Sequence, residues 1–381
     1  MSNPFGLTEE QELFRASVRE IAEAKMAPRA AEIDETDEYP WDMHKLLVEN
    51  GLMGVGYPEE YGGVGGPIEF CLMTEEISRV SAGISLIPLV NRLGSIPLLI
   101  AASEEQKASV LPGIVDGSRQ LAYCLTEPEA GSDAGSMRSR AVRDGDGWVI
   151  NGTKRFITNA GVADTYSFFA VTNPDAKKGK NISLFVVYRD RDGFEVTKLE
   201  HKMGIKGSPT GEVALADYRA ESGDLVGAEN EGFTYAMRTL DYSRPTIAAQ
   251  ALGIGQGAFD YAVGYAKERQ QFGQPISHFQ GIQFMLADMA MQLEAARMLT
   301  YRAATKVIER APDVSYHAAI AKCFASDTAM RVTTDAVQIL GGYGYVKEYP
   351  VERMMRDAKI TQIYEGTNQI QRLVIGRTVT R

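Results

Sequence analysis

The stretch Tyr364-Glu365-Gly366-Thr367-Asn368-Gln369 separates two segments of the chain, residues 351–360 and 370–374. Both segments place apolar residues at the spacing of a helix face. The six residues between them combine a glycine, a threonine and an asparagine, which are residue types that end and begin helices. The stretch therefore predicts a break between two helices, and the rest of the chain can be read outward from that break.

Glu365 is the residue in this break that carries chemistry. Gly366 can end the first helix in a left-handed conformation, and Thr367 can cap the second. A carboxylate beside backbone N–H groups that no helix satisfies suits proton abstraction next to a carbonyl. The base takes the proton while the donors stabilise the enolate oxygen. The same pattern also fits a solvated surface charge at a helix junction, and the stretch alone leaves both interpretations open.

Composition narrows the class of protein. A chain of 381 residues, with 44% hydrophobic and 24% charged residues, is expected to form two or three globular domains. A net charge of -10 argues against a nucleic-acid partner. The cysteines and histidines are widely scattered, which predicts a reducing compartment, no structural disulfide and no metal site. These residues are Cys71, Cys124 and Cys323, and His44, His201, His278 and His317.

Targeting and membrane segments are not expected. Residues 1–11 carry acidic residues and no basic-then-apolar pattern, which argues against a secretory signal. The apolar stretch 246–266 is interrupted by Gln250, Gln256 and Asp260, which argues against a membrane span. We therefore expect a cytoplasmic protein with no membrane partner.

Residues 1–118 are predicted to form a helical domain. Two sequences have the form of a capping box, in which a Ser or Thr cap is followed three residues later by Gln. A further helix is expected over 41–49 and a loop over 54–67, and Gly117 marks the end of the helical third. The capping boxes are Thr8 with Gln11 and Ser103 with Gln106.

Residues 119–231 are predicted to form a β domain. Short segments rich in β-branched and aromatic residues alternate with turn sequences such as Asp144-Gly145-Asp146-Gly147 and Asn151-Gly152. No helical pattern intervenes, which favours an antiparallel sheet or small barrel. The expected strands are 148–150, 156–158, 165–172, 182–188 and 194–199.

Residues 232–381 return to helical patterns and predict an antiparallel bundle. Met285, Met289 and Leu293 share a helix face, where they can pack in the core or line an acyl pocket. Glycines 253–257 fall inside a predicted helix, so a nucleotide cofactor must be held without a Rossmann turn. The three long helices are expected over 233–270, 279–310 and 316–340. The fold class is α+β, mainly α.

Two separated motifs resemble the signatures of the acyl-CoA dehydrogenases, FAD-dependent enzymes of fatty-acid and branched-chain acyl-CoA oxidation. The first is Tyr123-Cys124-Leu125-Thr126-Glu127-Pro128-Glu129-Ala130-Gly131-Ser132-Asp133. The second combines Asp335-Ala336-Val337-Gln338-Ile339-Leu340-Gly341-Gly342 with residues 356–369. The resemblance implies an N-terminal helical domain, a middle β domain and a C-terminal four-helix bundle. It also implies a homotetramer built as a dimer of dimers.

The resemblance implies where FAD binds. Residues of the β domain are expected to line the flavin ring, and Phe156 stands where many relatives have Trp, which keeps stacking but removes an indole N–H. A second group is expected to hold the pyrophosphate and adenosine, partly from a neighbouring subunit, and Thr367 and Gln369 to close the site. The flavin group is Tyr123, Leu125, Thr126, Gly131, Ser132, Phe156, Ile157 and Thr158; the second is Arg269, Gln271, Phe272, Gln280, Gln338, Gly341 and Gly342.

Some of these residues also have structural interpretations. Arg269 can be a helix-end charge, Gly341-Gly342 a helix C-cap, and Arg244 a buried ion-pair partner. The residues that the resemblance implies for the acyl-CoA are Ser132, Asp241, Arg244, Tyr364 and Gly366.

The resemblance also implies the reaction. Glu365 abstracts the α proton, its backbone N–H and a flavin ribityl hydroxyl hold the thioester oxygen, and the β hydrogen passes as hydride to FAD N5. The product is a trans-2-enoyl-CoA, and electrons pass to an electron-transfer flavoprotein. In the isovaleryl-CoA branch the base comes from the position of Ser243. Serine cannot act as the base unaided, which leaves Glu365 here.

Two rival functions remain open at this point. An acyl-CoA oxidase would pass electrons to oxygen directly, although such oxidases are commonly longer chains. A non-catalytic flavin-binding or scaffolding relative would not reduce its flavin with any acyl-CoA, and the retained Glu365 argues against it. We expect a short or medium acyl chain, straight or 2-branched.

Overall fold

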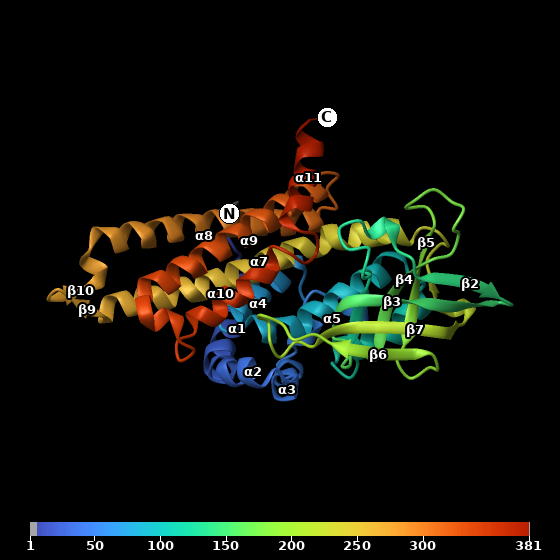
Figure 1. Ribbon diagram of the computed structural model, residues 1–381, viewed down its shortest axis with the longest axis horizontal. Coiled ribbons are helices and arrows are strands. Elements are labelled where there is room, and N and C mark those ends of the chain that lie inside the picture. Colours follow the sequence, from blue (N-terminus) through green and yellow to red (C-terminus); the bar gives the residue numbers. More distant parts are fainter. Residues whose placement is uncertain (1–5, 381) are drawn as a thin grey trace.

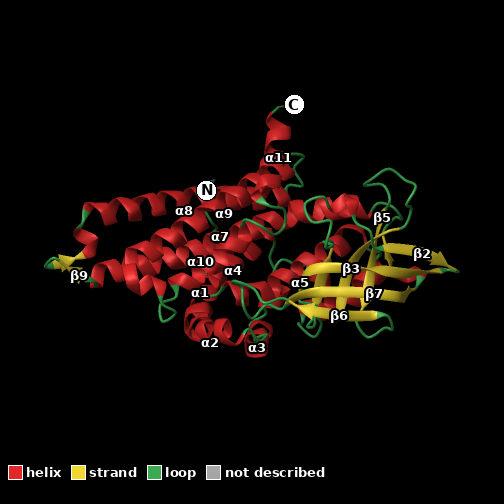
Figure 2. Ribbon diagram, in the orientation of Figure 1, coloured by secondary structure: helices red, strands yellow, loops and turns green. Residues whose placement is uncertain are grey.

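The computed structural model describes residues 6–380. A group of helices, a β-sheet and a bundle of long helices follow one another along the chain (Figures 1 and 2). The sheet lies at one end of the elongated molecule, and the far tip of the bundle lies at the other (Figure 1). This arrangement confirms the predicted order of helical, β and helical domains. The boundaries at 118 and 231 stay predictions.

The N-terminal helices form where local signals predict them. Both capping boxes are confirmed, because Thr8 and Ser103 each exchange side-chain and backbone hydrogen bonds with the Gln three residues later. The predicted loop 54–67 contains a turn of 3-10 helix, Glu59–Tyr61. The helices are α1 (Glu9–Ile21), α2 (Ala30–Thr36), α3 (Trp41–Glu49), α4 (Pro67–Ser78), α5 (Ala82–Ala101) and α6 (Glu104–Val115).

The helix α5 passes through the centre of the molecule. It is long and apolar enough to cross a membrane. The stretch considered from the sequence as a possible membrane span, residues 246–266, is a different one. Within the protein, 72% of the apolar window of α5 is buried. It packs against α7, α4 and β1, which places it between the helical and β parts of the chain.

The sheet is mixed, so the prediction of an antiparallel sheet was wrong in part. Most pairs are antiparallel, but β1 and β2 both pair with β4 in parallel. The strand order is β6-β7-β3-β2-β4-β5-β8, with β1 beside β4. The strands are β1 (Leu121–Cys124), β2 (Arg140–Asp144), β3 (Gly147–Thr158), β4 (Thr165–Val171), β5 (Ile182–Tyr188), β6 (Phe194–Leu199), β7 (Thr210–Ala220) and β8 (Leu225–Val226).

Asn151-Gly152 does not form the predicted turn. It lies inside the single strand β3, where the pairing with β7 shifts register. Gly152 is needed because a Cβ at this position would come within 2.2 Å of the Ser139 hydroxyl. The Asn151 side chain forms two hydrogen bonds with Asp217. Its amide oxygen accepts from the Asp217 backbone N–H at 2.8 Å, and its amide nitrogen donates to the Asp217 carboxylate at 3.1 Å. The glycine of this Asn-Gly pair is thus required by the close approach of Ser139 to β3, although the same pair of residues is typical of hairpin turns.

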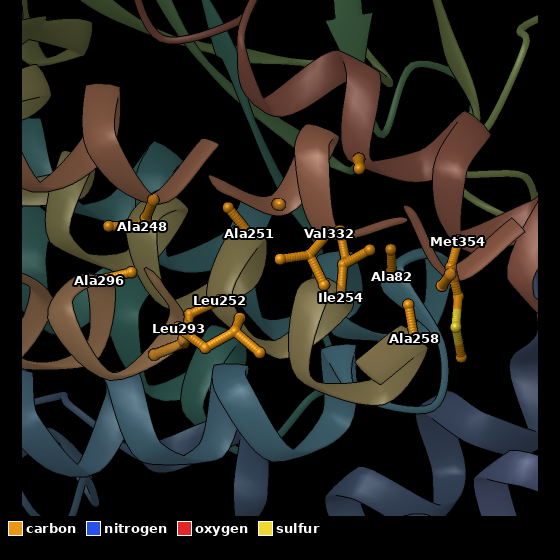
Figure 3. Packing of buried hydrophobic residues seen from close by; sticks show 14 of the residues in the cluster. Ala82, Ala248, Ala251, Leu252, Ile254, Ala258, Leu293, Ala296, Val332 and Met354 are labelled. Atoms are coloured by element: carbon orange, nitrogen blue, oxygen red, sulfur yellow. The ribbon is translucent and has the colours of Figure 1, made fainter. Parts of the chain in front are cut away.

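The bundle is built on small residues of the longest helix, α7. Its alanines let neighbouring helices approach closely, and Leu293, Val332 and Met354 pack against them (Figure 3). Met289 is buried in this core and Met285 packs against it, so these methionines belong to the core. The helices are α7 (Gly232–Glu268), α8 (Gln280–Ile308), α9 (Val314–Leu340), α10 (Val351–Thr361) and α11 (Asn368–Val379), with a short ribbon of β9 (Gln270–Gln271) and β10 (Gln274–Pro275) at the tip.

Two side chains of α10 join the three parts of the molecule. The Arg356 guanidinium contacts the Asp34 carboxylate of α2 at 2.6 Å and donates to the Met203 carbonyl at 2.9 Å. The next residue, Asp357, accepts a hydrogen bond from the Ile205 backbone N–H at 2.5 Å. The helix that leads into the Glu365 stretch is therefore held by the N-terminal helices and by the segment that joins β6 to β7.

Candidate functional site

A cavity of about 210 Å³ lies where α5, the sheet, α7 and the α10–α11 loop meet. Most of the residues predicted for the flavin ring and the acyl group line it, although they come from four separate parts of the chain. Asp241 is absent from the lining but contacts Arg244, which is part of it. The predicted residues that line the cavity are Tyr123, Leu125, Thr126, Gly131, Ser132, Phe156, Ile157, Thr158, Arg244, Tyr364, Glu365 and Gly366.

The loop that carries Glu365 has an unusual backbone. Glu365 and Gly366 both adopt left-handed conformations, with φ of 51° and 88°. The expectation that Gly366 ends the first helix was wrong, because α10 already ends at Thr361. Thr367 caps α11 as predicted, and its side-chain oxygen accepts from the Ile370 N–H at 3.3 Å. A left-handed residue that is not glycine is strained and persists only where its surroundings hold it.

The backbone N–H groups at this break fit the oxyanion role predicted for them. Over residues 6–380, neither the Glu365 nor the Gly366 N–H donates to a protein acceptor. Their carbonyl groups instead accept from the Gln371 side chain, at 3.2 and 2.9 Å. The donors of this loop thus remain free for a ligand, while its acceptors are satisfied.

Glu365 lines the cavity, and its carboxylate accepts a hydrogen bond from the Ser243 hydroxyl of α7. Burial raises the pKa of Glu365 to about 7. The Ser243 hydrogen bond and the charges of Arg244 and Lys322 act in the opposite direction and limit that rise. A carboxylate in a largely apolar cavity, with a pKa near neutrality, is the environment of a general base rather than of a solvated surface charge.

The position of Arg244 agrees with both interpretations that the sequence left open, a buried ion-pair partner and a contact for the acyl-CoA. It is buried, and its Nη1 lies 2.8 Å from the Asp241 carboxylate, as in a structural ion pair. It also lines the cavity, and its Nε has no hydrogen-bond partner among the described residues. Burial lowers the pKa of Arg244 and raises that of Asp241. A buried guanidinium with a free donor beside the cavity is suited to an acceptor on a ligand.

The predicted flavin segment is held by a buried ion pair that the sequence reasoning missed. Lys154 of β3 is fully buried, and its Nζ lies 2.9 Å from Glu127 and 3.2 Å from the Leu125 carbonyl. Glu127 also accepts from the backbone N–H groups of Arg138 and Ser139, at 2.5 and 2.9 Å. A single lysine in a strand carries no sequence signal of burial, so only the fold reveals this contact.

The residues predicted for pyrophosphate and adenosine lie elsewhere. Arg269, Gln271, Gly341 and Gly342 line a depression at the tip of the bundle, the end of the molecule opposite the sheet (Figure 1). The Arg269 guanidinium lies 5.4 Å from the Tyr343 ring centre. Arg269 and Gly341 are also the C-caps of α7 and α9, so their structural interpretations hold as well.

The remaining predicted cofactor residues do not join the main cavity. Phe272 is 93% exposed beside that tip, Gln280 begins α8, and Gln338 is exposed on α9. Thr367 and Gln369 line a third depression, on the outer side of the α10–α11 loop. One chain therefore brings together the predicted flavin and acyl residues but leaves the other predicted cofactor residues in separate places.

Matches to known proteins extend over nearly the whole chain. Three family profiles match, described as acyl-CoA dehydrogenase N-terminal domain over residues 8–118, middle domain over 122–218 and C-terminal domain over 230–380. The probable acyl-CoA dehydrogenase fadE25 of Mycobacterium tuberculosis is 51% identical over 379 residues, covering 99% of this chain and 97% of the relative.

Two solved structures share the fold over the full length of both chains. Butyryl-CoA dehydrogenase from Megasphaera elsdenii is 43% identical, with a TM-score of 0.96 and 100% of each chain covered. A chain in a structure described as "Electron transferring flavoprotein of Acidaminococcus fermentans: Towards a mechanism of flavin-based electron bifurcation" is 46% identical, with a TM-score of 0.96 and 100% of each chain covered.

Proposed function

The chain belongs to the acyl-CoA dehydrogenase family, whose members bind FAD, and we propose that it converts a short-chain acyl-CoA to the trans-2-enoyl-CoA with Glu365 as the base. The observation that carries this proposal is the position of Glu365 in the lining of the cavity, together with the predicted flavin residues. Its carboxylate accepts a hydrogen bond from the Ser243 hydroxyl.

The residues of the cavity fit a flavin. Thr126 and Thr158 offer hydroxyls at the lining, and a Cβ at Gly131 would meet open space, so the backbone there is accessible to a ligand. The Tyr123 hydroxyl is buried without a hydrogen-bond partner among the described residues. Phe156, held at a φ of 58°, presents a ring that is 60% exposed. When bound, FAD supplies the acceptor for the two electrons and the β hydrogen of the substrate.

Glu365 and its neighbours supply the proton chemistry. With its pKa at about 7, Glu365 is ionised in about half of the molecules at neutral pH and is a stronger base than an exposed glutamate. It takes the α proton, and the Ser243 hydroxyl and the Arg244 charge favour the ionised form of the carboxylate beforehand. The N–H groups at 365 and 366, which have no acceptor among residues 6–380, supply the donors proposed to stabilise a developing enolate oxygen.

The walls of the cavity support a short acyl chain. Apolar side chains of α5 and α7 exclude water from the proposed base, which strengthens the electrostatic interactions inside. Tyr364 lines the cavity and donates a hydrogen bond to Gln250, whose amide donates to the Ser85 hydroxyl at 3.1 Å. This chain of contacts favours the position of the Tyr364 ring in the wall of the cavity. The α5 and α7 side chains are Leu86, Leu89, Val90, Leu93, Met237 and Leu240.

The proposal extends to partners. An electron-transfer flavoprotein is the proposed electron acceptor, supported by the likeness to a chain from the structure described in those words. A homotetramer, built as a dimer of dimers, is proposed because the predicted cofactor residues occupy separate surfaces of one chain, among them the 93% exposed Phe272. A second subunit would bring such surfaces together. A cytoplasmic location also remains a proposal.

Anaerobic reduction of the bound flavin tests the function. The purified protein is mixed with straight acyl-CoAs of graded length and with 2-branched analogues, and the loss of flavin absorbance is followed. We expect butyryl-CoA to reduce the flavin fastest, and Glu365→Gln to retain FAD but react roughly 10² to 10⁴ times more slowly. Near-normal reduction in Glu365→Gln would overturn the assignment of the base.

The same experiment separates the rival functions. Rapid reoxidation when air is admitted would identify an acyl-CoA oxidase, whereas slow reoxidation that an electron-transfer flavoprotein accelerates supports the dehydrogenase. A flavin that no acyl-CoA reduces would identify a non-catalytic relative. A maximum with 2-branched or medium chains would leave the reaction intact and overturn the proposed substrate.

A further inference from the structure

Lys322 lies directly behind the loop that carries Glu365. It belongs to α9 and is fully buried. Its Nζ donates to the Gly366 carbonyl at 2.8 Å and to the Asn368 side-chain oxygen at 3.0 Å. Over residues 6–380, no carboxylate lies within ion-pair distance of this ammonium. Burial of an ammonium without an ion pair is costly, so its retention calls for an explanation.

The contacts around Lys322 hold the loop from two sides. The Gly366 carbonyl accepts from Lys322 and also from the Gln371 amide at 2.9 Å. The Asn368 amide group donates to the Ser326 hydroxyl at 2.8 Å and to the Asp327 carboxylate at 2.7 Å. Consecutive left-handed residues at 365 and 366 need such bracing, because the chain would otherwise relax to a more favourable backbone.

We propose that Lys322 is a positioning residue for the reaction: by holding the Gly366 carbonyl, its ammonium fixes Glu365 at the cavity so that the carboxylate keeps its hydrogen bond to the Ser243 hydroxyl. This inference rests on the proposed function of Glu365 as the base. Lys322 does not line the cavity and touches no reacting atom. It acts through the loop backbone and through its charge.

The charge adds a second effect. Side chains of α7, α9, β1 and the α10–α11 loop face Glu365, and of these side chains only Arg244 and Lys322 are cationic. Lys322 lowers the pKa of Glu365, while burial lowers the pKa of Lys322 to about 8. Removal of the ammonium should therefore raise the pH at which the base ionises. The facing groups are Ser243 and Arg244 of α7, Lys322 of α9, Tyr123 of β1 and the neighbouring Tyr364 of the loop.

A purely structural role for Lys322 predicts a different result. If the side chain only joined α9 to the start of α11, its loss would lower stability and leave the pH dependence of the reaction unchanged. The pH midpoint of flavin reduction therefore separates a positioning residue from a packing residue.

The test compares Lys322→Met, Lys322→Arg and Lys306→Met as FAD-loaded enzymes. Lys306 is a matched control because it lies on α8 and pairs with Glu309 at the surface. Limiting rates of anaerobic flavin reduction by butyryl-CoA are measured across pH. We expect Lys322→Met to slow reduction at least about tenfold and to raise the pH midpoint by about half a unit or more. Lys322→Arg should keep the midpoint, and Lys306→Met should match the parent.

Reduction by Lys322→Met at the parental rate and pH midpoint would overturn the inference. If Lys322→Met does not fold, Asn368→Ala is used to test the inference. This variant removes the side-chain oxygen that orients the Lys322 ammonium, so it should slow flavin reduction and raise its pH midpoint. A parental profile in Asn368→Ala would then reject the proposal. Glu365→Gln is measured beside these variants. Undiminished flavin reduction in Glu365→Gln would reject Glu365 as the base. Slow reduction in Glu365→Gln, combined with parental reduction in Lys322→Met, would reject only the role of Lys322.

Discussion

The Ser243 hydroxyl of α7 donates a hydrogen bond to the Glu365 carboxylate of the α10–α11 loop, across 122 positions of sequence. Two distant segments of the chain therefore meet at Glu365, which lines the cavity. The family resemblance implied this meeting, because related enzymes take their base from the Ser243 position. In this chain the helix supplies a hydrogen-bond donor, and the loop supplies the carboxylate.

Ser243→Ala should shift the pH dependence of flavin reduction. The hydrogen bond from Ser243 stabilises ionised Glu365, so its loss raises a pKa that is already about 7. A smaller fraction of the base is then ionised at pH 7, and we expect slower reduction there with recovery near pH 9. Thr239→Val is the control, because that hydroxyl on the same helix donates only to the Tyr235 carbonyl. An unchanged midpoint in Ser243→Ala would show that the hydrogen bond does not tune the base.

The base should be transferable between the two segments. In a Glu365→Gly background, Ser243→Glu places a carboxylate on α7 at the point that the lost carboxylate occupied. We expect partial recovery of the reduction rate, incomplete because a displacement of about 1 Å can cost about 10²-fold in proton transfer. The single Glu365→Gly variant sets the baseline. No gain over that baseline would mean that the two positions do not address the same α carbon.

Glu365→Gln should be more stable than the parent at high pH. Because the pKa of Glu365 in the folded state is about 7, above its usual value, the folded state binds this proton more tightly than the unfolded state. The stability gained from that proton is lost as pH rises through 7. A tenfold difference in proton affinity between the two states is worth about 1.4 kcal/mol, so with allowance for partial exposure we expect a gain on the order of 2 kcal/mol at pH 8. Urea unfolding at pH 8 and pH 5 measures it, and the gain should shrink toward pH 5.

Arg244→Ala should impair catalysis without unfolding the protein. It removes a cavity donor and leaves Asp241 without its ion-pair partner at 2.8 Å. We expect a higher KM or a lower kcat for butyryl-CoA, with FAD retained and part of the loss restored by Arg244→Lys. Steady-state kinetics and thermal unfolding are read together. A large fall in Tm with unchanged kinetics would assign Arg244 to structure alone.

Arg269→Ala should weaken FAD retention, although Arg269 lies at the tip of the bundle and does not line the main cavity. The expectation follows if a neighbouring subunit places this arginine beside the pyrophosphate, where a guanidinium binds well. The measurement is the FAD content after extensive dialysis, with Arg219→Ala as a control at an exposed site on β7 that pairs with Asp144. Equal FAD content in Arg269→Ala and the parent would remove Arg269 from the cofactor site.

Local signals explain how much of the fold could be predicted. The capping boxes at Thr8 and Ser103 and the helix at 41–49 depend on residues three or four apart, and all three formed as expected. The parallel pairing of Leu121 with Thr165 depends on residues far apart in the sequence, so no local pattern announces it. The turn expected at Asn151-Gly152 failed for a related reason: the glycine makes room for Ser139, which lies on the neighbouring segment.

The candidate site shows the same limit. The family resemblance implied that Tyr123, Thr158 and Glu365 belong to one site, and all three line the same cavity. It could not identify Lys154 or Lys322, because a lone lysine in a strand or helix carries no mark of burial until the neighbouring elements are in place. The distant position of Arg269 likewise had no sequence signal, because the contacts expected of it involve a second chain.

The contacts of Arg356 with Asp34 and of Asp357 with Ile205 hold the three domains together. The amount of FAD that the protein binds therefore measures how far its domains are assembled. The cavity exists only where three domains meet, so a ligand that fills it binds the assembled arrangement and not the separated parts. By mass action, free FAD then stabilises that arrangement by RT ln(1 + [FAD]/Kd). A substitution at Asp34, which does not line the cavity, would be compensated by added FAD. Dependence on the concentration of free FAD is thus a property that contacts away from the cavity can confer on this enzyme.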